Sequence, residues 1–139
     1  MADRQFRAAA SIYAELNRLT RQQDASVLNN LAYAYQQIGD TRMIDTAKRA
    51  YALAPRSAAI ADTYGWILLT SKSDIKMALR LLEQAARARP EDPNIRYHLA
   101  HAYYANGRET DARKHVALAL KSPNFLTRPR ALSLQARLR

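Results

Sequence analysis

The sequence contains no cysteine and only three glycines and five prolines among its 139 residues, and each scarcity excludes a class of structure. Without cysteine the chain has no disulfide framework and no thiolate zinc site, a composition that fits the cytosol and the periplasm alike. No apolar run approaches the roughly 20 residues that span a bilayer. Because helix breakers are few and alanine is abundant, intrinsic propensity favours helix. The length allows one domain with a modest core.

The positive charge is distributed unevenly along the chain. The formal net charge is +10, and half of that excess lies in residues 121–139, which contain no acid. The basic residues of this tail are Lys121, Arg128, Arg130, Arg137 and Arg139. The rest of the chain mixes both signs and is only mildly basic. This uneven distribution weakens an interpretation as a nucleic-acid-binding protein.

Three segments repeat one pattern, over residues 25–57, 58–92 and 93–122. In each, a large residue precedes a small one, another large residue follows three positions later, and a turn and a second apolar stretch lead to a proline. The large–small pairs are Leu31-Ala32, Tyr64-Gly65 and Leu99-Ala100, the later large residues are Tyr35, Leu68 and Tyr103, and the prolines are Pro55, Pro90 and Pro123. Small residues allow two helices to approach closely, and large residues fill the space between them. The pattern predicts three helical hairpins.

These spacings resemble the tetratricopeptide repeat, a helix–turn–helix unit of about 34 residues. The third segment is the most similar, through Leu99, Ala100, Tyr103, Gly107, Ala112, Val116 and Ala119. The resemblance implies an all-α fold, an α-α superhelix of three stacked helix-turn-helix repeats, because a single hairpin cannot bury its apolar face. We therefore expect one domain over residues 1–139.

The segment before the first repeat, residues 3–22, reads as the second helix of a repeat whose first helix is missing. Ala9, Tyr13 and Leu16 occupy its apolar positions. We therefore expect that the chain was cut from a longer repeat protein, and that these three residues lie uncovered and promote self-association.

The segment after the third repeat, residues 124–139, predicts a capping helix that begins at about Pro129. Leu132, Leu134 and Leu138 are expected on its apolar side. Its remaining surface is basic, as suits a terminal helix whose outer face meets water.

Two histidines, His98 and His101, are three residues apart and would lie on one helix face. A catalytic zinc site needs a third protein ligand, and His115 lies on the next helix, beyond a turn. The sequence also contains no nucleophile elbow and no phosphate-binding glycine loop. We predict no metal, no cofactor, no catalytic residue and no enzyme activity.

The resemblance also implies a concave groove lined by the first helix of each repeat. The residues that match its inner positions, and that we predict to bind a ligand, are Asn29, Tyr33, Gln36, Asp62, Trp66, Leu69, Asn94, Tyr97, His101 and Tyr104. Aromatic rings with polar tips beside amides suit an extended peptide or a helix, so a non-catalytic protein–protein interaction scaffold is the predicted function. Packing against a neighbouring helix is the alternative role for Trp66 and Tyr104.

One known ligand class of the family is disfavoured. Chaperone-binding repeats hold a terminal carboxylate with lysine, asparagine and arginine side chains at set positions. The matching residues of this chain are Asn29, Tyr33, Thr63, Asn94 and His98. None carries a fixed positive charge, so a carboxylate clamp of that type is not expected.

Two functions of other classes remain as alternatives. A polysaccharide-binding module would use Tyr33, Trp66 and Tyr104 as stacking platforms. Binding of RNA or anionic lipid would use the basic tail. RNA binding is disfavoured because we expect the aromatic residues and the tail charge on two separate surfaces.

The stretches "NNLAYAYQQIGD", "DTYGWILL" and "IRYHLAHAYYANGRETDARKHVALAL" resemble repeats of bacterial envelope proteins. They are similar to the C-terminal repeats of the PEP-CTERM/exosortase-associated tetratricopeptide lipoprotein, and to scaffolds of exopolysaccharide export. The resemblance implies a periplasmic or outer-membrane-associated parent protein with a protein partner. A cytoplasmic location is the alternative.

Overall fold

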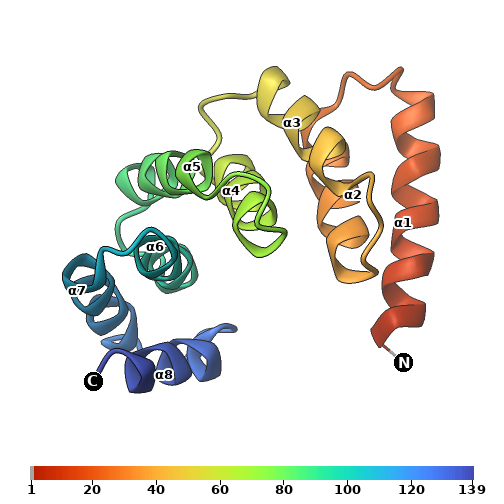
Figure 1. Ribbon diagram of the computed structural model, residues 1–139. Coiled ribbons are helices and arrows are strands. Elements are labelled where there is room, and N and C mark those ends of the chain that lie inside the picture. Colours follow the sequence, from red (N-terminus) through yellow and green to blue (C-terminus); the bar gives the residue numbers. More distant parts are fainter. Residues whose placement is uncertain (1) are drawn as a thin grey trace.

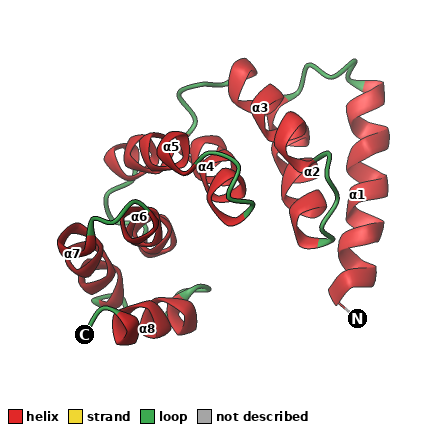
Figure 2. Cartoon of the chain, in the orientation of Figure 1, coloured by secondary structure: helices red, strands yellow, loops and turns green. Residues whose placement is uncertain are grey.

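The computed structural model describes residues 2–139, and this part of the chain forms eight helices and no strand. The helices are α1 (Ala2–Leu19), α2 (Ala25–Gln37), α3 (Met43–Leu53), α4 (Ala58–Thr70), α5 (Ile75–Ala88), α6 (Pro93–Ala105), α7 (Glu109–Leu120) and α8 (Arg128–Arg137). They follow one another around an arc, with α1 at one end and α8 at the other (Figures 1 and 2). The predicted all-α superhelical fold is confirmed. None of the described helices has the length and apolarity needed to cross a membrane.

The arc is built from three helical hairpins, α2–α3, α4–α5 and α6–α7, preceded by α1 and followed by α8. Along the inner row, α2 contacts α4, α4 contacts α6, and α6 contacts α8. The outer helices α3, α5 and α7 make no such contact with one another within residues 2–139. Because the inner row is packed more closely than the outer row, the array curves toward the inner helices (Figure 1).

The first helix of each hairpin begins at a side chain that caps it. Asp24 accepts a hydrogen bond from the Val27 amide, and Ser57 accepts one from the Ile60 amide. Asp92 caps α6, with Pro93 at the first helical position. These caps satisfy backbone donors that the helix itself leaves free, and they fix where each repeat starts.

The turn inside each hairpin uses one residue with positive φ. Gly39 and Gly107 fill this position in the first and third hairpins, at φ 67° and 78°. In the second hairpin the residue is Lys72, at φ 55°. The amide that follows each of these residues donates to a carbonyl five residues earlier, as from Ser73 to Leu68. This bond ends the inner helix and reverses the chain.

Two helices approach each other closely within the second hairpin, where α4 carries a glycine. A Cβ atom placed on Gly65 of α4 would lie 2.9 Å from Leu82 Cγ and 3.2 Å from Leu81 Cβ, both on α5. The matching small residues Ala32 and Ala100 are fully buried. The large–small pairs of the sequence therefore mark the helix–helix contacts, as predicted.

The N-terminal helix packs on α2, and this corrects one expectation. Ala9 and Tyr13 were predicted to lie uncovered, but both are half-buried against the cluster that joins α1 to α2. They are covered because α2 lies against that side of α1. Leu16 is 38% exposed, and the exposed apolar residues beside it are Ile12 and Leu19.

The C-terminal helix packs on α7 and α6. Ala131, Leu134 and Leu138 are buried, whereas Leu132 is 44% exposed. The prediction that Leu132 lies on the apolar side is wrong. It is wrong because the buried positions follow the spacing of residues 131, 134 and 138, and the adjacent residue 132 points about 100° away from residue 131.

Candidate ligand-binding groove

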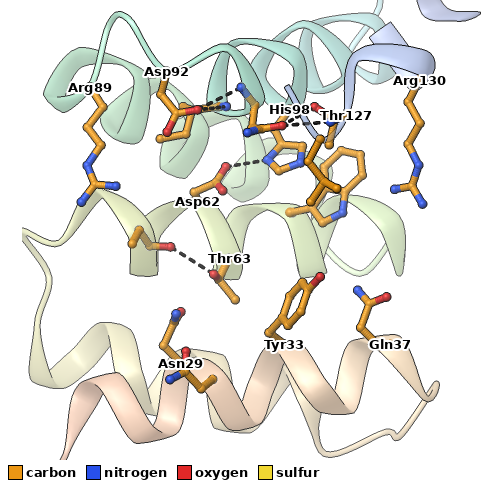
Figure 3. Close-up of a pocket in the computed structure, with 16 residues that line it drawn as sticks. Asn29, Tyr33, Gln37, Asp62, Thr63, Arg89, Asp92, His98, Thr127 and Arg130 are labelled. Carbon is orange, nitrogen blue, oxygen red and sulfur yellow. Dashed lines mark hydrogen bonds and ion pairs between the residues drawn. The ribbon is translucent and has the colours of Figure 1, made fainter. Parts of the chain in front are cut away.

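A cavity of about 600 Å³ opens on the inner row between α2, α4, α6 and the start of α8. Five of the predicted groove residues line it: Asn29, Tyr33, Asp62, Trp66 and Asn94. Figure 3 shows Asn29, Tyr33 and Gln37 rising from α2 toward Asp62 on α4 and His98 on α6. The three inner helices thus contribute to one site, although their residues lie more than twenty positions apart in the sequence.

A second cavity of about 340 Å³ adjoins the first. The two cavities share Trp66 and Arg130, and the predicted residues Tyr97 and His101 line the second one. Its other lining residues are Thr70 and, from α8, Ser133, Leu134 and Arg137. We call the two adjoining cavities together the groove.

Three predicted residues lie outside the groove. Leu69 is 4% exposed and belongs to the main core, so its predicted place in the groove is wrong. It is buried because α4 is packed among four other helices, α2, α3, α5 and α6. Gln36 donates from Nε2 to Thr70 Oγ1 at 3.0 Å and links α2 to α4. Tyr104 packs against the main core and lines neither cavity.

An aspartate, a histidine and a tryptophan form the floor of the groove. The Nδ1–H of His98 donates to Asp62 Oδ1 at 2.7 Å, which joins α6 to α4. The His98 ring stacks on Trp66 with centroids 4.1 Å apart and planes 23° apart. The edge of His101 also meets Trp66, at 5.5 Å. His98 therefore covers one face of the indole, and packing on the neighbouring helix accounts for that face of Trp66.

The C-terminal segment closes one side of the groove. Asn94 Oδ1 accepts two hydrogen bonds from Thr127, one from the backbone amide at 3.0 Å and one from the hydroxyl at 2.8 Å. Leu126 and Arg130 line the first cavity beside Thr127. Asn94 was predicted to bind a ligand, but its side-chain oxygen Oδ1 instead binds the segment that leads into α8.

The charges of the groove differ between its two cavities. Arg89 and Arg130 line opposite sides of the first cavity (Figure 3), which also contains Asp62 and Asp92. Both carboxylates already accept hydrogen bonds, from His98 and from the first amides of α6. The second cavity contains Arg130 and Arg137 and no acid. Its charge is therefore positive and uncompensated.

The tail charge and the aromatic residues share one surface, so the expectation of two separate surfaces is wrong. The reason is that α8 packs on α6 in the place that the first helix of a further repeat would take. Sequence reasoning missed Arg89, Thr127, Arg130 and Arg137 as groove residues. The repeat spacing was a usable signal for Arg130 and Arg137, because a helix after the third repeat is expected to extend the inner row.

The environment of the second cavity shifts two pKa values. Burial raises the pKa of Tyr97, against the opposing effect of Arg130 and Arg137. Burial lowers the pKa of His101, and the nearby charges of Arg137 and His98 lower it further. His101 is therefore favoured in its neutral form, with the Tyr97 hydroxyl 3.4 Å from its Nδ1. Across residues 2–139, no three histidine, aspartate or glutamate side chains are grouped so that they could hold a metal ion.

Solved structures of other helical repeat proteins have a similar fold. A crystal structure of MamA matches with a TM-score of 0.78 at 19% identity, over 96% of this chain and 76% of that one. MamA from Desulfovibrio magneticus RS-1 gives a TM-score of 0.72 at 24% identity, over 84% of this chain and 65% of that one. A thermophilic TPR protein of Thermus thermophilus gives 0.71 at 23% identity, over 96% of this chain and 71% of that one.

At these identities the likeness concerns the fold alone. No curated protein sequence matches the chain. Residues 69–138, half of the chain, match the family described as tetratricopeptide repeat, and the chain belongs to that family.

Proposed function

We propose that the chain is a non-catalytic protein-binding module that holds an extended segment of a partner protein in the groove. The observation that carries this proposal is a row of unused side-chain amides along α2. Asn29, Asn30 and Gln37 line the first cavity and form no hydrogen bond with any other part of residues 2–139. An amide offers both a donor and an acceptor, which is what the backbone of an extended peptide requires.

An aromatic ring beside these amides supports the same function. Tyr33 is 43% exposed and lines the first cavity, and its ring lies in a T-shaped arrangement with Phe6, with centroids 5.8 Å apart. A tyrosine in this position offers apolar contact area and a hydroxyl at little cost in side-chain entropy. The first cavity thus combines an exposed aromatic ring with side-chain amides that can bond a peptide backbone.

The geometry does not favour the polysaccharide alternative. Of the three proposed stacking platforms, Trp66 has one face covered by His98, and Tyr104 packs against the core. Only Tyr33 presents an open ring. RNA binding meets the same obstacle, since Tyr97 beside the arginines is 4% exposed and offers no free face for a base.

The setting of the protein is part of the proposal. The resemblance of three sequence stretches to envelope repeat proteins supports a fragment of a larger bacterial export or sorting protein, on the periplasmic side. This setting rests on the sequence resemblance alone. The groove itself does not depend on it.

Selection of random peptides displayed on phage against the immobilised chain tests the proposal. Binders should be recovered, and Tyr33→Ala should weaken them about tenfold, the loss of about 1.4 kcal/mol expected for an interface tyrosine. Leu132→Ala is the matched control, because Leu132 is exposed to the same extent but lies outside the groove. Absence of binders, or equal loss in both variants, would contradict the proposal.

A further inference from the structure

The second cavity is the positively charged end of the groove, and its charge indicates the chemistry of the bound partner. This inference rests on the proposed function. Five arginine and lysine residues lie in the tail after residue 120. Arg128 is held by the Ser122 carbonyl, to which its Nε donates at 3.4 Å. Arg130 and Arg137 form no hydrogen bond and no ion pair with another described residue, and both line the second cavity.

The two free arginines lie on one face of α8. They are seven residues apart, two helical turns, and Ser133 lies between them on the same side. Across the cavity are Trp66 and Thr70 of α4 and Tyr97 and His101 of α6. The two carboxylates of the adjoining first cavity, Asp62 and Asp92, already accept hydrogen bonds.

The surroundings strengthen the effect of these charges. The lining of this cavity includes Tyr97 of α6 and Leu134 of α8, which are 4% and 3% exposed. An apolar wall lowers the local dielectric constant, so a charge beside it acts more strongly on a bound group than a fully solvated one does. Burial lowers the pKa of His101, and Arg137 lies close enough across the cavity to lower it further.

We propose that the second cavity accepts an aspartate or glutamate side chain of the segment bound in the groove, with Arg130 and Arg137 as its charged partners. The partner segment is thus acidic at one end and meets amides and Tyr33 at the other. The residues at the clamp positions of the family, such as Asn29 and His98, carry no fixed charge. In this chain the positive charge comes instead from α8, a helix outside the repeats.

The guanidinium group suits this role better than an ammonium would. It offers several N–H donors in one plane and pairs with a carboxylate through two parallel bonds. The neutral His101 ring can add a further N–H, since its Nε2 has no hydrogen-bond partner within residues 2–139. An acidic side chain would satisfy these donors without displacing an existing ion pair.

The test compares peptides selected on the parent chain with those selected on an Arg130→Gln/Arg137→Gln variant. The parent should enrich peptides with aspartate or glutamate, and the variant should enrich peptides without this preference. Arg139→Gln is the control, because it removes one positive charge from the same end of the chain, at a residue that lines a different cavity. It should select the same acidic peptides as the parent.

Affinity measurements on one acidic binder make the test quantitative. Replacing its acidic residue by the corresponding amide should weaken binding by about fivefold or more on the parent chain, and hardly at all on the double variant. The difference should shrink at high salt. An amidated carboxyl terminus on every peptide ensures that only side-chain carboxylates are compared.

The failures of the two proposals are distinguishable. If no peptide binds, the proposed function fails. If peptides bind through Tyr33 but show no acidic preference, only the carboxylate assignment fails. If a single-stranded oligouridine binds more tightly than the acidic peptides, and the double variant abolishes its binding, the assignment to a carboxylate is likewise overturned.

Discussion

Replacing Gly65 by alanine tests whether the close approach of α4 and α5 holds the second hairpin together. The new Cβ would lie 2.9 Å from Leu82 Cγ and 3.2 Å from Leu81 Cβ, whereas carbon atoms in ordinary contact are about 3.5–4.0 Å apart. Neither leucine has room to retreat, since their exposed fractions are 0% and 2%. The two helices must therefore separate, or Leu82 must leave its preferred rotamer.

Two effects of this substitution oppose each other. Overpacking a buried site costs about 1–3 kcal/mol, while replacing glycine by alanine within a helix gains about 1 kcal/mol. The contacted atoms are buried and close to the backbone of α5, so the cost of overpacking should lie in the upper half of that range. We expect a net loss of about 1–2 kcal/mol in the free energy of unfolding. For a chain of this length the melting temperature should fall by about 3–8 °C.

Urea unfolding followed by far-ultraviolet circular dichroism measures this loss, and a double-mutant cycle assigns it to the contact. Combined with Leu82→Ala, which removes the contacted atoms, Gly65→Ala should cost at least about 1 kcal/mol less than in the parent. Gly39→Ala is the control for the contact. Its positive φ makes alanine costly, but no atom lies within 4 Å of the new Cβ, so its cost should not depend on Leu82. A Gly65→Ala protein as stable as the parent would refute the reasoning.

Two further predictions concern the C-terminal part of the chain. Asn94→Ala removes both hydrogen bonds from Thr127 and should release the segment before α8, at a cost of about 1–3 kcal/mol in the free energy of unfolding. Amide hydrogen exchange in α8 should become faster. Asn30→Ala is the control, because the Asn30 side chain lines the same cavity but forms no hydrogen bond, and it should leave exchange unchanged. Burial lowers the pKa of His101 and of His115 below 6.5, and Arg137 and Arg96 respectively act in the same direction. The unfolded chain therefore binds these protons more readily than the folded chain. The free energy of unfolding should be highest above pH 6.5, and it should decline as the pH falls from 6.5 through the lowered pKa values of the two histidines. Urea unfolding at several pH values should show a smaller decline in a His101→Asn/His115→Asn variant, and an identical decline in both proteins would contradict the assignment.

The fold could be predicted because its determinants are local and repeat three times. The pairs Leu31-Ala32, Tyr64-Gly65 and Leu99-Ala100 recur at a fixed distance from a turn, so each segment supports the reading of the others. The turns agree at the level of single residues, with Gly39 and Gly107 at the predicted breaks. Lys72 takes the same backbone conformation without glycine, and there the polar residues around it were the only signal.

The site was predicted only as far as the resemblance to the repeat family determines it. The resemblance places Asn29, Tyr33, Asp62 and Trp66 on the inner row, and the structure places all four around the first cavity. It does not say how deeply a neighbouring helix covers an inner residue, which is why Leu69 was misplaced. Burial at that position depends on the packing of α4 among four other helices.

The role of the terminal helix follows from how the repeats stack. Any helix that packs in the place of a further repeat extends the inner row, whatever its own sequence pattern, and its side chains then face the groove. In this chain α8 brings two arginines to a wall that includes the buried Tyr97. The Arg130 and Arg137 side chains are exposed and pair with no other group of residues 2–139, so an anionic group bound in the second cavity can pair with both. A ligand that supplies such a group must therefore also stabilise the packing of α8 on α6, since a ligand that binds the folded form alone raises its stability. If the second cavity binds a carboxylate as proposed, the helix that caps this superhelix also determines the selectivity of its groove.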